Sequence, residues 1–188
     1  HFKAVCDAVD MPIIVYNIPG RCGVNIETAT LQRIAQLENV AAVKEASGNI
    51  GQMGDVLEGI ARMRRGFCVM SGDDAMTMPL MALGGRGVIS VVSNLVPEKV
   101  VAMVNACLEG DFARARELHF GLLPIFKGAF IETNPVPIKE AMAMCGMPSG
   151  ACRLPLCEMS QGNRQKLEKI IAGLGIVKQV SNPIAAGR

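Results

Sequence analysis

The 188-residue sequence has little of several features that would point to particular classes of protein. It contains no tryptophan, one tyrosine and two histidines, and its 19 basic and 17 acidic residues leave a net charge of only +2. A chain without a basic block has no electrostatic footprint for nucleic acid. No apolar run approaches the ~18 residues of a membrane span, and no Gly-x-Gly-x-x-Gly or phosphate-loop pattern supports nucleotide binding. We therefore expect neither a nucleic-acid nor a membrane partner.

The seven cysteines are odd in number and form no Cys-x-x-Cys pair. Only His1 and His119 are available to complete a ligand set, so a tetrahedral zinc site has little support and no metal is expected. Half of the residues are hydrophobic, enough to bury a core without disulfides. We expect reduced thiols and a cytoplasmic location.

Short apolar, β-branched runs alternate with helical patterns in the first hundred residues. Strands are predicted at 12–16, 40–44, 67–70 and 88–92. Helices are predicted at 2–9, 28–37, 52–63 and 76–83. This order indicates βα units on a parallel sheet that is buried on both faces. The α/β candidates are a doubly wound sheet and a (β/α)₈ TIM barrel.

Strand patterns end after about residue 97. Helices are predicted from there at 100–108, 112–130, 138–145 and 161–174. We divide the chain into an α/β domain, 1–108, and a helical C-terminal domain, 109–188, with a loose tail after Lys178.

Two residues at the ends of predicted strands carry the main chemical signal. Lys44 closes an otherwise apolar strand, and partial desolvation there would lower its pKa and free the lone pair that a Schiff-base lysine needs. Tyr16, the only tyrosine, ends the preceding strand, so both side chains should emerge on one face of a parallel sheet. A phenol beside the amine could transfer protons during imine formation. The alternatives are a lysine that extends to solvent and an ordinary strand aromatic.

The loops after these strands supply candidate binding groups. Arg21 follows Tyr16 and carries a rigid fork that suits a carboxylate, although a surface arginine would fit the same position. Glycines in these loops, Gly72 among them, permit a close approach of the backbone to a ligand.

An ordered set of motifs resembles one known family. The chain reads YNIPGRCG at 16–23, VKEASGN at 43–49, SGDD at 71–74 and GGRGVIS at 84–90. It continues with NPVPIK at 134–139 and RLP at 153–155. Together these segments resemble the dihydrodipicolinate synthase (4-hydroxy-tetrahydrodipicolinate synthase) family, within the pyruvate-dependent class I aldolases. Arg21 and the VKEASGN run favour this family over sialic-acid or keto-sugar-acid lyases.

The resemblance implies a (β/α)₈ barrel with a helical C-terminal domain, and a role in lysine and diaminopimelate biosynthesis. Lys44 would form an imine with pyruvate, whose enamine attacks L-aspartate 4-semialdehyde, while Tyr16 relays protons. The iminium is the electron sink, so no cofactor is implied. A homo-oligomer, dimeric or tetrameric, is the implied assembly.

The same resemblance assigns the substrate-binding residues. Arg21 would bind the carboxylate of the semialdehyde. The Ile89 carbonyl would orient the pyruvate-derived part, and Gly72 and Asn94 would line the same site.

The predicted strands number four, whereas a barrel needs eight, and they resemble the fifth to the eighth of the family. The helix at 2–9 has no capping residue before it, so we expect this chain to be the C-terminal portion of a synthase, with near-zero turnover alone. A half-barrel would expose an apolar face and strand edges, so it should be unstable, aggregate or pair. The alternatives are another pyruvate-dependent aldolase and a non-catalytic half-barrel that acts as an assembly module.

Overall fold

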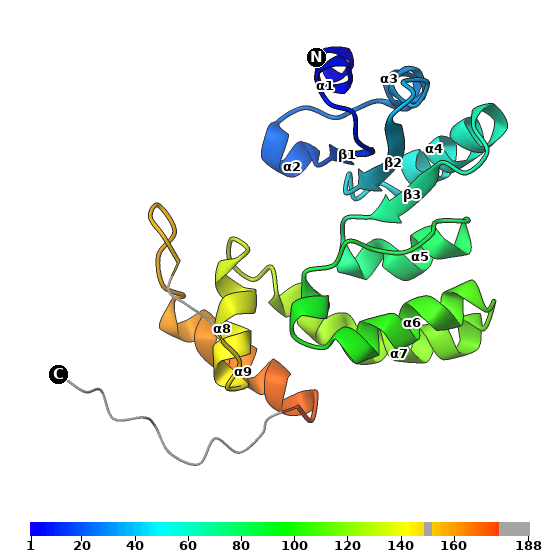
Figure 1. Ribbon diagram of the computed structural model, residues 1–188. Coiled ribbons are helices and arrows are strands. Elements are labelled where there is room, and N and C mark those ends of the chain that lie inside the picture. Colours follow the sequence, from blue (N-terminus) through cyan, green and yellow to red (C-terminus); the bar gives the residue numbers. More distant parts are fainter. Residues whose placement is uncertain (149–151, 177–188) are drawn as a thin grey trace. The chain divides into compact units, whose positions relative to one another are not determined.

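The computed structural model describes residues 1–148 and 152–176, and Figure 1 shows the course of the chain. The described residues form two compact units. The first contains His1–Ser90 and Ala102–Arg116, and the second contains Val91–Val101 and the described residues from Glu117 onward. The expected tail after Lys178 lies outside the described residues.

A three-stranded parallel sheet forms the centre of the first unit. Its strands are β1 (Ile13–Asn17), β2 (Val40–Glu45) and β3 (Cys68–Ser71), in the order β1-β2-β3. These three strands confirm the first three predicted ones, with shifts of one residue at most ends. Strands of parallel sheets are usually covered on both faces, so successive residues are apolar whichever face they point to.

Helices cover one face of this sheet. They are α1 (Phe2–Ala8), α3 (Thr28–Ile34), α4 (Ile50–Met63) and α5 (Thr77–Ala82), the last preceded by a 3₁₀ turn, η1 (Asp74–Met76). The short helix α2 (Pro19–Cys22) lies in the connection after β1 and has no buried residue. Side chains alternate along each strand, so Val15, Val43 and Val69 all point to the helical side and are buried there. The core continues into α3, α4 and α5 through Leu31, Ile34, Met53, Val56, Ile60 and Leu80. The helix α2 was not predicted, because four residues are too few to show a periodicity.

The opposite face of the sheet is exposed along β1 and half-buried or buried along β2 and β3. Ile14 retains 48% of its accessible surface and Tyr16 retains 40%. Both belong to β1, which is an edge strand. Ala42 of β2 is buried on this face, so the open part of the sheet is the edge strand, and burial of the sheet on both faces stays a prediction for a closed barrel.

The predicted strand at 88–92 is wrong. Only Val88 pairs with β3, through a single parallel bridge to Ser71. Gly87 adopts a φ of 149°, which few other residues tolerate, and the Ser90 hydroxyl donates to Asp74. The chain then turns into a 3₁₀ helix, η2 (Val92–Asn94). Of the apolar residues of this run, only Val92 is fully buried, in the turn, whereas Ile89 is exposed.

The second unit is helical. It contains α8 (Val136–Met144), α9 (Gln161–Gly173) and most of α7 (Phe112–Gly128). The start of α7, up to Arg116, belongs to the first unit, and α6 (Pro97–Leu108) is divided between the units after Val101. A Cβ atom on Gly128 would lie 2.9 Å from Ile170 Cδ1, so glycine allows α7 and α9 to pack closely. These helices confirm the predicted ones, although the expected domain boundary at residue 108 stays a prediction. None of the described helices is long and apolar enough to cross a lipid bilayer.

Candidate active site

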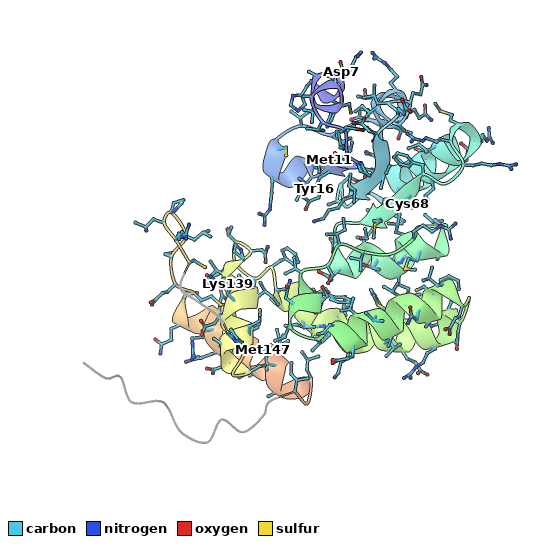
Figure 2. The ribbon with its side chains drawn as sticks, viewed as in Figure 1. Asp7, Met11, Tyr16, Cys68, Lys139 and Met147 are labelled. Carbon is cyan, nitrogen blue, oxygen red and sulfur yellow. The ribbon has the colours of Figure 1, made fainter. Side chains whose placement is uncertain are left out.

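Lys44 and Tyr16 lie side by side at the carboxyl ends of β2 and β1, and Figure 2 labels Tyr16 on the sheet. The two residues are direct partners in the parallel register, so their side chains leave the same face. Lys44 Nζ lies 4.1 Å from the centroid of the Tyr16 ring. The negative π face of the ring attracts a cation at this distance. The contact holds the amine against the only phenol of the chain.

Gly72, the residue after β3, packs against the aliphatic stem of Lys44. A Cβ atom on Gly72 would lie 3.1 Å from both Cγ and Cε of Lys44, and 2.8 Å from the Cβ atom of Ala46. Carbon atoms at van der Waals contact are about 3.5–4.0 Å apart, so a side chain here would displace its neighbours. The Gly72 N–H also donates to the Glu45 carbonyl at 2.7 Å. Gly72 thus allows the loop after β3 to close over Lys44.

The surroundings of Lys44 favour its neutral form. Burial is the largest influence and lowers the pKa of the amine. The carboxylate of Asp74 acts in the opposite direction and raises the pKa, whereas the positive charge of Arg21 lowers it. A lowered pKa increases the fraction of unprotonated amine near neutral pH, which is the form that attacks a carbonyl.

The pKa of the Tyr16 phenol is shifted in the opposite direction to that of Lys44. Burial, the largest influence, raises its pKa above 10.0, and the negative charges of Cys22 and Asp73 add to this, while Arg21 opposes it. The phenol therefore stays protonated over a wide pH range and is available as a proton donor. An amine with a lowered pKa beside a phenol with a raised pKa suits nucleophilic attack with proton transfer.

The remaining predicted site residues lie in different places. Arg21 lies on α2, and its charge influences both Lys44 and Tyr16. Ile89 follows the bridge to β3, and its N–H donates to the Ser71 carbonyl at 2.9 Å. Asn94 belongs to the second unit, in η2, where its side-chain amide donates to the Val91 carbonyl at 2.9 Å. Tyr16, Arg21, Lys44, Gly72 and Ile89 thus share the first unit, and the role of each stays a prediction.

A row of buried polar residues beneath the site was not predicted. Asn17, Glu45 and Ser71 are direct neighbours in the register of the three strands, and all three are fully buried. Each follows the site-facing residue of its strand and therefore points to the opposite, helical side of the sheet. Polar residues at strand ends usually face solvent, so their letters alone did not distinguish them from loop residues.

A carboxylate lies close to Lys44 on another element. Asp74 begins η1 and is almost completely buried, and it accepts a hydrogen bond from the Ser90 hydroxyl. The Asp73 side chain caps the same turn by accepting from the Ala75 N–H at 2.8 Å. An aspartate is among the residues most favoured at a helix N-cap.

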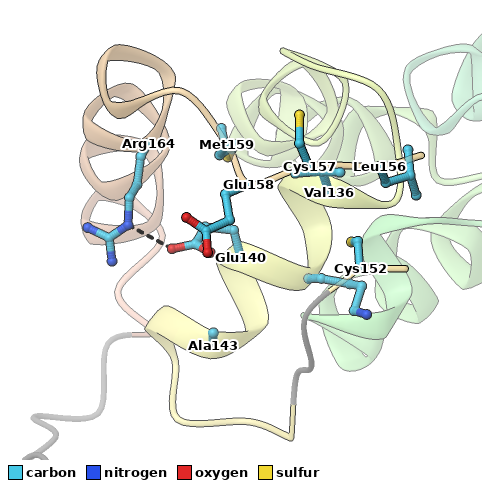
Figure 3. A pocket seen from close by; sticks show the side chains of 10 residues that line it. Val136, Glu140, Ala143, Cys152, Leu156, Cys157, Glu158, Met159 and Arg164 are labelled. Atoms are coloured by element: carbon cyan, nitrogen blue, oxygen red, sulfur yellow. Dashed lines mark hydrogen bonds and ion pairs between the residues drawn. The ribbon is translucent and has the colours of Figure 1, made fainter. Parts of the chain in front are cut away.

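The second unit contains a separate cavity of about 710 Å³, shown in Figure 3. Its polar lining includes Lys139, Glu140, Glu158 and Arg164, and Arg164 Nε donates to Glu140 at 2.7 Å. None of the predicted site residues lines this cavity. Within residues 1–148 and 152–176, no group of three or more His, Cys, Asp or Glu side chains is arranged to hold a metal ion.

Comparisons with known proteins agree on one family. The sequence profile described as the dihydrodipicolinate synthetase family matches residues 1–174. The 4-hydroxy-tetrahydrodipicolinate synthase of Protochlamydia amoebophila is 52% identical over 171 residues, which cover 91% of this chain and 57% of that protein. The protein of the same name from Methanocaldococcus jannaschii is 46% identical over 178 residues, covering 94% of this chain and 60% of the other.

Solved structures give the same result. The dihydrodipicolinate synthase of Aquifex aeolicus has a TM-score of 0.89 and 45% identity, covering 95% of this chain and 60% of that one. The dihydrodipicolinate synthase of Thermotoga maritima has a TM-score of 0.91 and 38% identity, covering 94% of this chain and 60% of that one. The chain thus spans about three fifths of the length of the proteins it matches.

Proposed function

The chain belongs to the dihydrodipicolinate synthetase family, and from this premise we propose that it carries the Schiff-base site of a 4-hydroxy-tetrahydrodipicolinate synthase. The reaction would condense pyruvate with L-aspartate 4-semialdehyde, a step in lysine and diaminopimelate biosynthesis. The observation that carries the proposal is the contact of 4.1 Å between Lys44 Nζ and the Tyr16 ring, at an amine whose pKa is lowered by burial. The lowered pKa favours the amine form that attacks a carbonyl, and the contact keeps the Tyr16 side chain beside it.

The first half of the proposed reaction forms the imine. The neutral Lys44 nitrogen attacks the ketone carbon of pyruvate, and the carbonyl oxygen takes up a proton to give a carbinolamine. A second proton on that oxygen allows water to leave, and the cationic imine remains. The Tyr16 phenol, protonated because its pKa is raised, supplies protons and recovers them in these steps.

The second half forms the new carbon–carbon bond. The positive imine acidifies the pyruvate methyl group, and loss of a proton gives an enamine whose carbon attacks the aldehyde of the semialdehyde. The amino group of the semialdehyde then displaces Lys44 by transimination, which closes the ring and regenerates the amine. The protein-bound iminium accepts the electrons, so the proposed reaction needs no cofactor or metal.

Substrate recognition is proposed for the residues around the amine. Arg21 would bind the carboxylate of the semialdehyde, because its guanidinium can bind both oxygens. The Ile89 carbonyl would orient the pyruvate-derived part. Gly72 would keep the backbone close to the bound imine, and Asn94 is proposed as a further binding residue.

We further propose that the three-stranded sheet is part of a (β/α)₈ barrel in the cytoplasmic enzyme, which assembles as a homo-oligomer. The exposed face of β1 supports this proposal, because Ile14 and Tyr16 would be covered in a closed barrel. For the 188-residue chain alone, we expect imine formation without appreciable synthase turnover.

The test is to trap the imine. Incubation with pyruvate and borohydride should reduce the adduct to a stable secondary amine, and peptide mapping should locate it on Lys44. Lys44→Arg should abolish the adduct, whereas Lys127→Arg, an exposed lysine of α7, should leave it unchanged. If no lysine of the chain were modified while an intact relative reacted, the proposal would fail.

A further inference from the structure

We propose that Asn17, Glu45 and Ser71, here called the buried polar row, are positioning residues that hold Lys44 and Tyr16 in their reactive arrangement. The inference rests on the proposed function of the site. It concerns side chains that point away from the site and would touch no substrate. The row acts through the loops that follow the three strands.

The row lies directly behind the site in the sheet register. Tyr16 is paired with Lys44 and Lys44 with Met70, and one residue further along, Asn17 is paired with Glu45 and Glu45 with Ser71. Asn17 Nδ2 donates to Glu45 Oε2 at 3.0 Å, so a side-chain bond ties β1 to β2 immediately after Tyr16 and Lys44. The relative position of the amine and the phenol therefore depends on this bond.

Each member of the row also fixes the loop that follows its strand. Asn17 Oδ1 accepts from the Ile26 N–H at 3.0 Å, which closes the loop that contains α2 and Arg21. Glu45 Oε1 accepts from the Ser47 N–H at 2.6 Å. The Ser71 hydroxyl donates to the Asp73 carbonyl at 2.6 Å and closes the turn around Gly72.

The polarity of the row has a cost that an apolar row would avoid. A buried carboxylate is strongly disfavoured unless its oxygens are hydrogen-bonded, and replacing such groups by apolar residues is often neutral or stabilising. Both oxygens of Glu45 are satisfied, one by a side chain and one by the backbone. An apolar side chain could fill this space but could not hold the Ser47 N–H or the Asn17 amide, so we assign the row to placing the loops.

The hydrogen-bond pattern defines a rescue experiment. In Glu45→Gln, the new amide nitrogen would face either the Asn17 amide or the Ser47 N–H, and donors cannot bond to each other. Rotating the Asn17 amide by half a turn would present its oxygen to the new amide nitrogen. The same rotation would place the Asn17 NH₂ against the Ile26 N–H, which is also a donor. The double variant Asn17→Asp/Glu45→Gln restores a donor and an acceptor to the pair. It loses the bond that Asn17 Nδ2 donates to Asn25 Oδ1 at 3.0 Å, and that oxygen keeps Gln52 Nε2 as a donor at 3.3 Å.

Tyr16 supplies a readout that needs no substrate. It is the only tyrosine in a chain without tryptophan, so the ultraviolet absorbance of tyrosinate reports its ionisation alone. The charged groups that influence it are Arg21, Cys22 and Asp73, and none of them is altered in these variants. The second readout is the rate of pyruvate trapping on Lys44.

We expect Glu45→Gln to lower the ionisation midpoint of Tyr16 toward 10.0, because solvent enters a loosened site. Trapping on Lys44 should slow by about tenfold or more, since displacements near 1 Å are costly to reaction rates. The double variant should recover most of both losses. Ser71→Ala should shift Tyr16 in the same direction, and it carries the test if Glu45→Gln does not fold.

The control is Arg64→Gln, which removes part-buried hydrogen bonds at the opposite end of β2, including one to the Val40 carbonyl at 2.7 Å. It should lower stability and leave the Tyr16 midpoint unchanged. The proposal is overturned if Arg64→Gln moves the midpoint as far as Glu45→Gln, if Glu45→Gln moves neither readout, or if the double variant rescues nothing. Failure of wild-type trapping would instead reject the proposed function, and the Tyr16 titration would still decide the role of the row.

Discussion

Gly72 sets how closely the loop after β3 approaches Lys44. The missing side chain leaves room for the lysine stem, whose Cγ and Cε atoms would each lie 3.1 Å from an added Cβ. The direction of the amine is therefore determined as much by this neighbour as by the strand that carries it.

Replacing Gly72 by alanine should displace both the loop and the lysine. We expect Gly72→Ala to lower the free energy of unfolding by about 1–3 kcal/mol, as overpacking usually does, and to slow trapping of pyruvate. Urea denaturation and borohydride trapping measure the two effects. Gly121→Ala is the matched control, because an added Cβ there meets open space in α7 and should not destabilise. Equal behaviour of the two variants would contradict this account.

His119 gives the second unit a dependence on pH. It is buried on α7 between the rings of Phe120 and Phe126, and its Nδ1 has no hydrogen-bond partner. Burial lowers the pKa of the imidazole below 6.5 in the folded state, so the unfolded chain binds the proton more readily. The stability contributed by the neutral ring is present above pH 6.5 and is lost as the pH falls through the lower, folded-state pKa.

The free energy of unfolding should therefore decrease on acidification from pH 7, by no more than about 1.4 kcal/mol per pH unit for this one proton. In His119→Phe that component of the pH dependence should vanish. Denaturation series at several pH values compare the two. Parallel curves for wild type and variant would show that His119 is not responsible.

At the scale of the elements, Arg64 joins the end of α4 to the start of β2. Its Nη1 donates to the carbonyls of Ala35, Leu37 and Val40 at 2.7, 3.0 and 2.7 Å, and Nη2 donates to Glu38 at 2.9 Å. One guanidinium thus binds the carbonyl at the C-cap of α3 and the carbonyls of the segment that leads into β2.

Arg64→Gln should cost roughly 1–3 kcal/mol of unfolding free energy, because the carbonyls of two buried residues, Ala35 and Val40, lose their charged donor. Arg62→Gln provides the control, since Arg62 is exposed and its ion pair with Glu58 lies on the surface of α4. Chemical denaturation of the two variants makes the comparison. A loss of similar size in both variants would show that the hydrogen bonds of Arg64 contribute no more to stability than a surface ion pair.

The strands and long helices could be predicted because their apolar residues recur with a clear period or in a continuous run. The neighbouring positions of Tyr16 and Lys44 follow from the same pattern, since the ends of adjacent parallel strands share an edge. The run at 88–92 has the same composition as a strand, but Gly87 and the Ser90–Asp74 bond turn the chain instead. Tertiary hydrogen bonds of this kind do not produce a periodic pattern in the amino-acid sequence.

The buried polar row could not be found for a related reason. Asn17 and Glu45 can be buried because they are hydrogen-bonded to each other, although 28 positions separate them in the sequence. Their burial therefore depends on the register of two strands, which no local window contains. Arg64 is similar, since its acceptors lie more than twenty residues earlier.

At the scale of the whole molecule, the exposed face of the sheet should govern association. Ile14 is 48% exposed on an edge strand, and apolar faces of this kind tend to pair. Ile14→Lys should lower the average mass measured by light scattering across a concentration series. Val101→Lys changes an equally exposed residue of α6, which is 53% exposed, and should have less effect. If Val101→Lys dissociated the protein as well, the sheet face would not be the contact.

The path of the chain between the units has a further consequence. It passes from one unit to the other after Ser90, Val101 and Arg116, and the second of these crossings falls inside α6. A single cut at any crossing leaves residues of one unit attached to the other, and a cut after Val101 also breaks the hydrogen-bond ladder of a helix. The two units are therefore not exchangeable modules. A recombination event that replaced one of them would have to rejoin the gene at several points at once.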